Sequence, residues 1–302
     1  MVSHWHILGA GAIGGLFAAA LERLNGHTSL LTRGDTVSDT ADPGRRTLNI
    51  LSGDSTTTVD FPTSTASETG YISHLLITTK AYDVAAALAA VSHRLDEGSH
   101  ILLMVNGMGI LEILEKDYPH WRFYVGTTTE GAYRTSGNTI VHAGIGFTRI
   151  GRANTDSPPA WFEGWRTLPL PCHWDADITE VLWQKMVVNS AINPLTALAA
   201  CPNGALLSRP DLSAQLKGLC DEIATISAAA GHHAIASELH DTVREVITGT
   251  ANNRSSMLQD IEAARQTEVE YISGYLIAVA RQRGVPAPLN EALLRSILKL
   301  SG

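Results

Sequence analysis

The sequence predicts an α/β dinucleotide-binding half followed by an all-helical half. Three observations predict this fold: a glycine-rich turn after the first apolar segment, short apolar strands that alternate with helices, and a series of helices from about residue 177 onward. Strands that alternate with helices build parallel sheets from βαβ units. We therefore expect two domains, residues 1–176 and 177–302, and the length of 302 residues is sufficient for both.

The first half begins with a strand, a turn and a helix. Residues 6–8 form a short apolar strand, residues 9–15 a glycine-rich turn, and residues 16–24 an Ala- and Leu-rich helix that Gly26 ends. Further short apolar runs, typical of strands buried on both faces, follow at residues 29–32, 75–79 and 101–105, with a helix predicted over 84–95.

The sheet is expected to continue as hairpins through three β-rich pieces, residues 123–128, 139–142 and 147–150. Residues 36–58 are polar and irregular, and we predict no element there. The second half is expected to be helical throughout, with helices over 178–200, 211–230, 238–250, 256–283 and 288–300. Gly231 and Gly284 stand where glycines end helices.

Composition narrows the functional classes. The formal net charge of −8 argues against a nucleic-acid partner, and no uninterrupted apolar run is long enough for a membrane span. The three cysteines have no CxxC spacing and the twelve histidines no metal-ligand spacing, so we expect neither disulfides nor a metal site. No signal peptide is evident, and we expect a cytoplasmic protein.

The glycine-rich turn has the GxGxxG pattern in the required setting, after a strand and at the start of a helix. Its residues are Gly9, Ala10, Gly11, Ala12, Ile13 and Gly14. Such glycines allow a tight turn, a close approach to a pyrophosphate and close helix packing, and the helix N-terminus attracts phosphate. The second predicted strand ends at Arg33, where NAD-binding proteins carry an acidic residue. Arg33 therefore favours NADPH, although Asp35 lies two residues later.

Two ionisable residues occur where helix faces are otherwise apolar. On the helix from residue 178, Lys185 falls in the apolar stripe, and Asn189 and Asn193 follow on the same side. On the helix from residue 256, Glu268 interrupts a second stripe. A buried charge needs a partner of opposite charge or a ligand. Lys185 and Glu268 could be such partners for each other. The alternatives are a structural salt bridge and a lysine that reaches out to solvent.

A lysine ammonium beside a carbonyl group can polarise it and donate a proton to its oxygen. Reduction of a ketone by a nicotinamide needs such a proton donor. Partial burial lowers the pKa of a lysine toward neutrality, whereas a neighbouring carboxylate raises it again. Lys185 and Glu268 are therefore our candidate catalytic residues.

Segments along nearly the whole chain resemble the ketopantoate (2-dehydropantoate) reductase family. The segments that carry the resemblance are GAGAIGG (9–15), TTKAYDV (78–84), NGMG (106–109), GTTTEGA (126–132), LWQKMVVNSAINPLTAL (182–198), CPNG (201–204) and SSMLQDI…TEVEYISG (255–274). The resemblance implies a Rossmann-type domain, a helical domain of the 6-phosphogluconate dehydrogenase C-terminal-like type, and NADPH-dependent reduction of ketopantoate to pantoate on the route to coenzyme A.

The resemblance also implies individual roles. Lys185 matches the proposed general acid of the family, and Glu268 a glutamate beside the lysine and the cofactor. Arg33, Lys80, Asn106 and Ala132 match cofactor-contacting positions. The substrate-binding positions matched are Asn106, Lys185, Asn189, Asn193, Asn203, Ser256, Met257, Leu258 and Gln259. Without the resemblance, Asn106-Gly107 and Asn203-Gly204 would be read as ordinary turns, and Ser256 with Gln259 as a helix cap.

Two other functions stay open at this point. A related enzyme that reduces another bulky 2-keto acid could keep these residues, and a non-catalytic NADPH sensor could keep the same fold. The sensor is disfavoured because such proteins lose the proton donor, whereas Lys185 and Glu268 are both present. The expected partner is a small 2-keto acid, and we expect a monomer or a homodimer.

Overall fold

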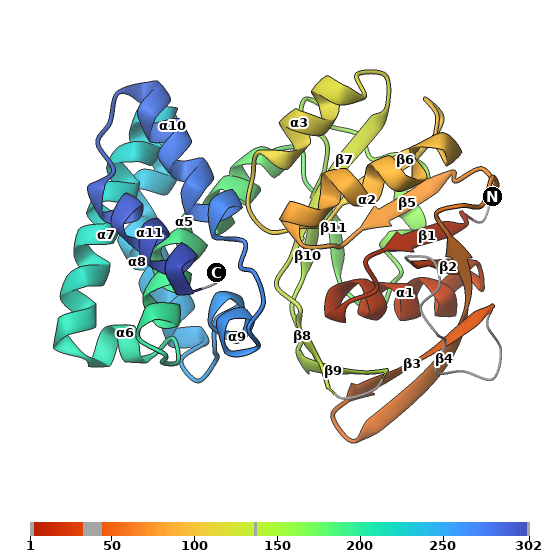
Figure 1. The fold of residues 1–302 in the computed structure, drawn as a ribbon, viewed down its shortest axis with the longest axis horizontal. Helices are drawn as coiled ribbons and strands as arrows, with labels where there is room; N and C mark the ends of the chain where they lie inside the picture. The colour runs from red at the N-terminus through yellow and green to blue at the C-terminus, as the bar shows by residue number, and fades with distance from the viewer. Residues whose placement is uncertain (1–2, 33–43, 136–137, 301–302) are drawn as a thin grey trace. The chain divides into compact units, whose positions relative to one another are not determined.

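The computed structural model describes residues 3–32, 44–135 and 138–300. They fall into two compact units. Unit 1 comprises residues up to Val105 together with Ile110–Val181, and unit 2 comprises Asn106–Gly109 together with the chain from Leu182 onward. Figure 1 shows the helices and strands of both units, with a label on each except α4 (Phe162–Trp165).

Unit 1 contains an 11-stranded sheet among the residues described. Its strands are β1 (Trp5–Leu8), β2 (Thr28–Thr32), β3 (Arg45–Ser52), β4 (Ser55–Thr65), β5 (His74–Ile77), β6 (His100–Leu103), β7 (Arg122–Thr128), β8 (Gly131–Arg134), β9 (Thr139–Gly144), β10 (Thr148–Gly151) and β11 (Cys172–Trp174). Its helices are α1 (Ala12–Asn25), α2 (Val84–Val91), α3 (Ile110–Asp117) and α4 (Phe162–Trp165).

The centre of the sheet is parallel, in the order β4-β2-β1-β5-β6-β7. When only these six parallel strands are numbered along the chain, their order in the sheet is 3-2-1-4-5-6, the order of dinucleotide-binding sheets. In such sheets, ligands bind at the carboxyl ends of the strands, at the point where the order reverses. The reversal lies between β1 and β5. The predicted α/β half is confirmed, and its sheet topology points to the end of β1 as the ligand edge.

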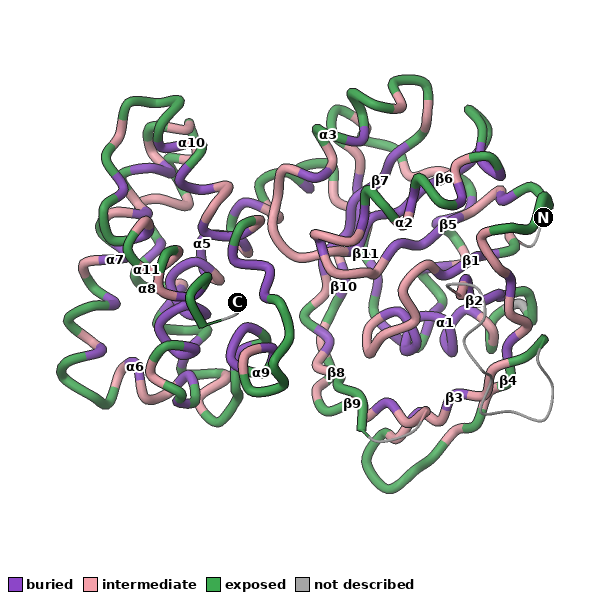
Figure 2. Tube along the Cα trace, in the orientation of Figure 1, coloured by how far each residue is buried: buried purple, intermediate pink, exposed green. Residues whose placement is uncertain are grey.

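The sheet is covered on both faces. On β5 and β6, Leu76 and Leu102 join the core cluster that contains the α1 side chains, whereas their neighbours Leu75 and Ile101 are buried outside that cluster. Successive strand residues point to opposite faces, so α1 packs on one face and the second face is buried as well. Figure 2 shows buried residues along these central strands.

Residues 45–65, most of which fall in the segment for which we predicted no element, form the β3–β4 hairpin. Strand β9 pairs with β3, and β8 pairs with β9, so this second part of the sheet reaches α1. The expectation of a turn up to residue 15 was wrong in one detail, because α1 begins at Ala12 and includes Gly14 and Gly15.

Unit 2 is helical, as predicted. Its helices are α5 (Ile178–Leu198), α6 (Ala205–Ser208), α7 (Pro210–Ala230), α8 (His233–Gly249), α9 (Ser256–Glu262), α10 (Tyr275–Arg283) and α11 (Pro288–Leu300), and a π-helical turn spans Glu270–Gly274. The first residues of α5, up to Val181, belong to unit 1. Gly231 and Gly284 end α7 and α10 in the left-handed conformation, as expected.

The single helix expected over residues 256–283 is wrong. Helix α9 ends at Glu262, and Ala264 has a φ of 50°, which the right-handed helix does not allow. Backbone hydrogen bonds from Ala264 to Ile261 and from Arg265 to Asp260 close the turn after α9. The apolar stripe that placed Glu268 on a continuous helix was therefore based on incorrect geometry, although Glu268 is buried all the same.

Among the described residues, no helix combines the length and the apolar character that a membrane span requires.

Candidate functional site

The glycine-rich turn connects β1 to α1 at the edge of the sheet where the strand order reverses. Gly9 has a φ of 100°, and a Cβ atom there would lie 2.6 Å from the backbone nitrogen of Thr79. A Cβ atom on Gly14 would lie 2.2 Å from Thr78 Oγ1 and 2.3 Å from Gly9 O. These two glycines therefore allow α1 to pack against the ends of β1 and β5.

Gly11 differs from Gly9 and Gly14, because its surroundings leave space for a side chain. A Cβ atom there would meet no atom closer than Gly9 O, at 3.9 Å. Protein packing therefore gives no reason for a glycine at this position. In a dinucleotide-binding turn, this is the position at which the backbone approaches the pyrophosphate. The residues of the turn thus fit a dinucleotide.

The other predicted cofactor residues of unit 1 occupy different places in the sheet. Lys80 comes soon after β5, at the start of a short 3-10 helix over Ala81–Asp83. Ala132 lies on β8, directly opposite His142. Arg33 lies outside the described residues. Sequence reasoning missed Thr78, whose hydroxyl donates a 2.7 Å hydrogen bond to Gly9 O. The TTK segment, which contains Thr78, was part of the resemblance. A threonine after a strand can have many structural roles, however, so the sequence did not indicate this hydrogen bond.

Asn106 and the next three residues follow β6, yet they belong to the helical unit. The backbone nitrogen of Met108 donates a 2.9 Å hydrogen bond to Tyr271 O. Gly107 has a φ of 82°, and a Cβ atom there would lie 2.3 Å from Tyr271 O. The NGMG segment is therefore not an ordinary turn, because its glycine permits close contact with the π-helical segment.

The candidate catalytic residues lie together in unit 2. Asn106 Nδ2 donates a 3.1 Å hydrogen bond to Glu268 Oε2, and the Glu268 residue is only 5% exposed. Lys185, on α5, is partly buried. Burial lowers the pKa of Lys185 from 10.5 to about 8, and the negative charge of Glu268 opposes this decrease. A partly buried ammonium near a carboxylate, with a pKa close to neutrality, can hold a proton and release it.

The predicted substrate-binding residues have different surroundings. Asn189 is partly buried and Asn193 is buried on α5. Asn203 Nδ2 donates a 2.9 Å hydrogen bond to Thr250 Oγ1, and its backbone nitrogen donates to Asn253 O. These contacts of Asn203 join the start of α6 to the chain after α8, which is a structural use of the residue.

At the start of α9, the residue that caps the helix is not one of the residues predicted for the site. Ser255, not Ser256, is the N-cap, because its Oγ accepts a 3.2 Å hydrogen bond from the backbone nitrogen of Leu258. The alternative reading of Ser256 and Gln259 as a cap was therefore wrong: Ser256 is exposed, and Gln259 Nε2 donates to Arg254 O. The side chains of Met257 and Leu258 are buried in the helical core.

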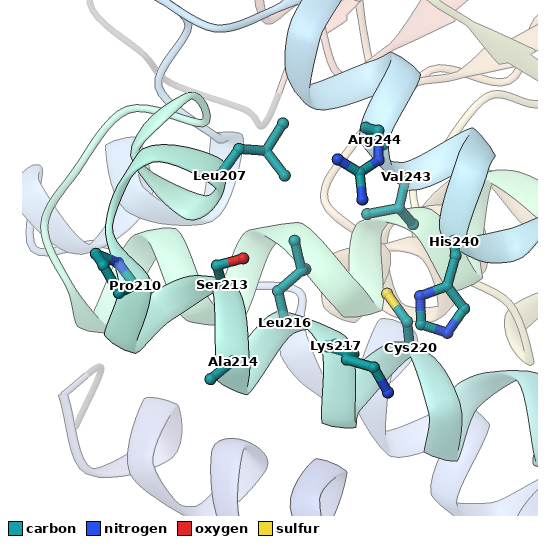
Figure 3. Close-up of a pocket in the computed structure, with 10 residues that line it drawn as sticks. All are labelled: Leu207, Pro210, Ser213, Ala214, Leu216, Lys217, Cys220, His240, Val243 and Arg244. Atoms are coloured by element: carbon teal, nitrogen blue, oxygen red, sulfur yellow. The ribbon is translucent and has the colours of Figure 1, made fainter.

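A cavity of about 520 Å³ lies elsewhere in unit 2, where side chains of α6, α7 and α8 converge (Figure 3). Its lining residues are Leu207, Pro210, Ser213, Ala214, Leu216, Lys217, Cys220, His240, Val243 and Arg244. None of the predicted site residues is among them, and we assign it no role in catalysis.

Comparisons with known proteins agree with this arrangement. Residues 5–155 match the family model described as ketopantoate reductase PanE/ApbA, and residues 177–300 match that of its C-terminal part. A 2-dehydropantoate 2-reductase of Vibrio cholerae is 33% identical over 97% of this chain and 96% of its own length. One of Shigella flexneri is 40% identical over 74% of this chain and 72% of its own length.

Solved structures share the fold. A PanE/ApbA family ketopantoate reductase from Ralstonia eutropha has a TM-score of 0.87 at 20% identity, covering 99% of this chain and 98% of that one. A D-mandelate dehydrogenase, solved with NADH and anilino(oxo)acetate, has the same TM-score, identity and coverage. Likeness at this identity shows the fold alone. The two family models and the full-length Vibrio cholerae relative show more: this chain belongs to the ketopantoate reductase family.

Proposed function

We propose that this protein reduces 2-dehydropantoate to pantoate with NADPH, in the cytoplasm and on the route to pantothenate and coenzyme A. The observation that carries the proposal is Lys185, a partly buried lysine with a pKa of about 8 beside the buried Glu268. A reductase of 2-keto acids needs such a proton donor. The full-length match to a 2-dehydropantoate 2-reductase supports the choice of substrate.

When bound, the nicotinamide cofactor would supply the hydride that the carbonyl carbon of the substrate needs. Lys185 donates a proton from Nζ to the carbonyl oxygen as the C=O double bond becomes a C–OH bond. The neutral amine left on Lys185 then takes a proton from solvent. Because the pKa of Lys185 is near neutrality, both the donation and the reprotonation are accessible at physiological pH.

Glu268 has an electrostatic role in this proposal. Its negative charge raises the pKa of Lys185 and so keeps the lysine protonated before the reaction. The hydrogen bond from Asn106 fixes one carboxylate oxygen of Glu268. Asn106 itself would lie near both the nicotinamide and the substrate, as the resemblance implies.

Neutral polar groups would bind the rest of the substrate. We propose that the amides of Asn189, Asn193 and Asn203 and the first turn of α9, Ser256–Gln259, contact it. The side chains of Met257 and Leu258 belong to the helical core, so only their backbone groups would be used. Hydrogen-bonding amides and hydroxyls suit a hydroxylated keto acid, because a substrate without the hydroxyl would leave them unpaired.

We propose NADPH as the cofactor, bound by residues 9–14 with Lys80, Ala132 and Asn106, and with Arg33 on its 2′-phosphate. Residues 1–176 would form the cofactor domain, and residues 177–302 the substrate and catalytic domain. A solved ketopantoate reductase from Staphylococcus aureus is described as dimeric, and a homodimer is one of the two assemblies we propose, besides a monomer.

A second candidate function is the reduction of another bulky 2-keto acid. One observation favours it: the D-mandelate dehydrogenase solved with NADH shares this fold over 99% of the chain. The same framework therefore serves an enzyme whose name specifies a different hydroxy acid. The two relatives of higher sequence identity described above, from Vibrio cholerae and Shigella flexneri, are 2-dehydropantoate 2-reductases and favour ketopantoate.

The deciding experiment is a steady-state assay that follows the nicotinamide absorbance. Ketopantoate is compared with branched-chain and aromatic 2-keto acids, each with NADPH and with NADH. We expect the highest kcat/KM for ketopantoate with NADPH. Faster turnover of another keto acid would select the second candidate function. If NADPH bound and no keto acid turned over, the assignment as a reductase would fail.

A further inference from the structure

The hairpin of β8 and β9 packs on the first turns of α1 through a glycine outside the GxGxxG motif. A Cβ atom on Gly15 would lie 2.2 Å from Ile140 Cδ1 and 3.2 Å from Leu48 Cδ1. Ile140, on β9, is fully buried. The second glycine of the GG pair thus lets the hairpin lie directly against the helix that begins at the dinucleotide turn.

The register of the hairpin then brings a cation to that turn. Arg134, the last residue of β8, pairs with Ile140. Its Nη1 lies 3.5 Å from the carbonyl oxygen of Ala10, within the glycine-rich turn, and the residue is exposed. Its Nη2 donates a 3.3 Å hydrogen bond to Asn138 Oδ1.

Asn138 is itself held in place. Its backbone oxygen accepts a 2.9 Å hydrogen bond from the backbone nitrogen of Asn49 on β3, and its Oδ1 also accepts from Arg46, at 3.5 Å. Strand β8 is fixed at its other end, where Glu130 Oε2 lies 2.6 Å from Nε2 of His142. The guanidinium group of Arg134 is therefore positioned by the fold rather than left on a loose surface side chain.

We infer that Arg134 binds the pyrophosphate of the dinucleotide, an inference that rests on the cofactor assignment of the proposed function. The N-terminal turn of α1 offers backbone N–H groups and a partial positive charge to phosphate, and it carries no basic side chain of its own. A guanidinium group is planar and presents paired N–H donors that match phosphate oxygens. Arg134 adds this full charge at the turn where the backbone approaches the phosphates.

The 2′-phosphate is a different group, expected at the end of β2 and assigned to Arg33. The roles of Arg134 and Arg33 can be distinguished with ligands that either contain or lack the 2′-phosphate. NADPH contains both the pyrophosphate and the 2′-phosphate, whereas NADH and ADP-ribose contain only the pyrophosphate. Calorimetric titration of the whole protein with each ligand measures binding without turnover.

Arg134→Met is expected to weaken the binding of NADPH, NADH and ADP-ribose by a common factor, roughly 10- to 100-fold. Arg33→Met is expected to weaken only NADPH. Arg134→Lys should restore part of the loss, since it keeps the charge without the paired donors. Asn138→Ala should weaken all three ligands to a smaller degree. Arg166→Met, at an exposed arginine on the surface of unit 1, is the matched control and should change none.

Unchanged binding of all three ligands to Arg134→Met would overturn the inference. A loss confined to NADPH would also overturn it, because Arg134 would then contact the 2′-phosphate. If the wild-type protein bound the dinucleotides but reduced no keto acid, the proposed reaction alone would fail, and the comparison of variants would still decide the role of Arg134. If the wild-type protein bound none of the three, both would fail.

Discussion

Asn106 and Glu268 are 162 residues apart in the sequence, and a 3.1 Å hydrogen bond joins their side chains. Asn106 comes from the loop after a strand of the sheet, whereas Glu268 precedes the π-helical turn of the helical unit. The hydrogen bond fixes the orientation of the carboxylate that acts on Lys185.

Lys185→Ala should remove the proton donor and lower kcat roughly 10²- to 10⁴-fold. The affinity for NADPH, measured by calorimetry, should change little. In the wild-type protein, activity should fall as the pH rises through about 8, because Lys185 then loses the proton that it must donate. Lys217→Ala, at an exposed lysine of α7, is the control. Full activity of Lys185→Ala would contradict the role of general acid.

Glu268→Gln should move the alkaline limb of the pH–rate profile to lower pH. The reason is that the Glu268 charge raises the pKa of Lys185, so its removal lets burial lower this pKa further. Asn106→Ala removes the hydrogen bond but keeps the charge, so its alkaline limb should stay near pH 8 while kcat/KM decreases. An unshifted profile in Glu268→Gln would show that this carboxylate does not act on the titrating group.

Gly11→Ala and Gly14→Ala should have opposite kinds of effect. At Gly14 the new Cβ atom would lie 2.2 Å from Thr78 Oγ1, and the overpacking should cost roughly 1–3 kcal/mol of unfolding free energy or more. At Gly11 the nearest atom is 3.9 Å away, so the loss should not exceed about 1 kcal/mol for a poorer N-cap. The binding of NADPH should nevertheless weaken in Gly11→Ala. Urea unfolding and calorimetric titration of both variants test the pair.

Ser255→Ala and Ser256→Ala should separate stability from substrate binding. Ser255 caps α9, and its Oγ also accepts a 2.8 Å hydrogen bond from the buried Thr196. Ser255→Ala should therefore lower the unfolding free energy by about 1 kcal/mol or more. Ser256 is exposed, so Ser256→Ala should change the unfolding free energy by less than about 0.5 kcal/mol. Its KM for the keto acid should rise, and an unchanged KM would remove Ser256 from the substrate site.

Two histidines of unit 1 should make the protein sensitive to acid. Burial lowers the pKa of His6 to about 3 and that of His74 to about 4, from 6.5. Positive charge nearby adds to this effect: His4 and Arg94 act on His6, and His100 and His4 act on His74, while Glu68 opposes the change at His6.

When the pKa of a group is lower in the folded state, a decrease in pH protonates the group in the unfolded chain before it does so in the folded protein. The decrease in pH therefore favours the unfolded chain. Stability should therefore be complete above pH 6.5 and fall as the pH decreases toward 4, by an amount on the order of a few kcal/mol. Unfolding free energies measured across this range test the prediction. His6→Gln should reduce the slope, whereas His173→Gln, at an exposed histidine, should not. An equal slope in all three proteins would contradict it.

The sequence predicted those parts of the fold that follow from local pattern. The strand–turn–helix at the N-terminus and the long amphipathic helices of unit 2 were predictable because periodicity and glycines decide them. The β3–β4 hairpin was missed because its alternating residues are polar and threonine-rich, and its place is set by pairing with β2 and β9. Such pairing is a tertiary property that a single segment does not reveal.

For the candidate site, residue types were informative but local geometry was not. Glu268 was singled out from a helical stripe that the turn at Ala264 interrupts. Alanine is a good helix former, so nothing in the segment signalled a left-handed residue there. Arg134 could not be recognised either, because its proximity to Ala10 depends on how β9 packs against Gly15.

The assignment of Asn106–Gly109 to the helical unit means that the chain passes between the two units three times, after Val105, after Gly109 and after Val181. A fragment that begins at residue 177 would therefore lack this tetrapeptide, whose Gly107 and Met108 contact Tyr271 and whose Asn106 donates a hydrogen bond to Glu268. Chimeras that exchange the C-terminal half between relatives would inherit a mismatch at this tetrapeptide. A gene divided for separate expression of the helical unit would need this tetrapeptide added to the C-terminal fragment.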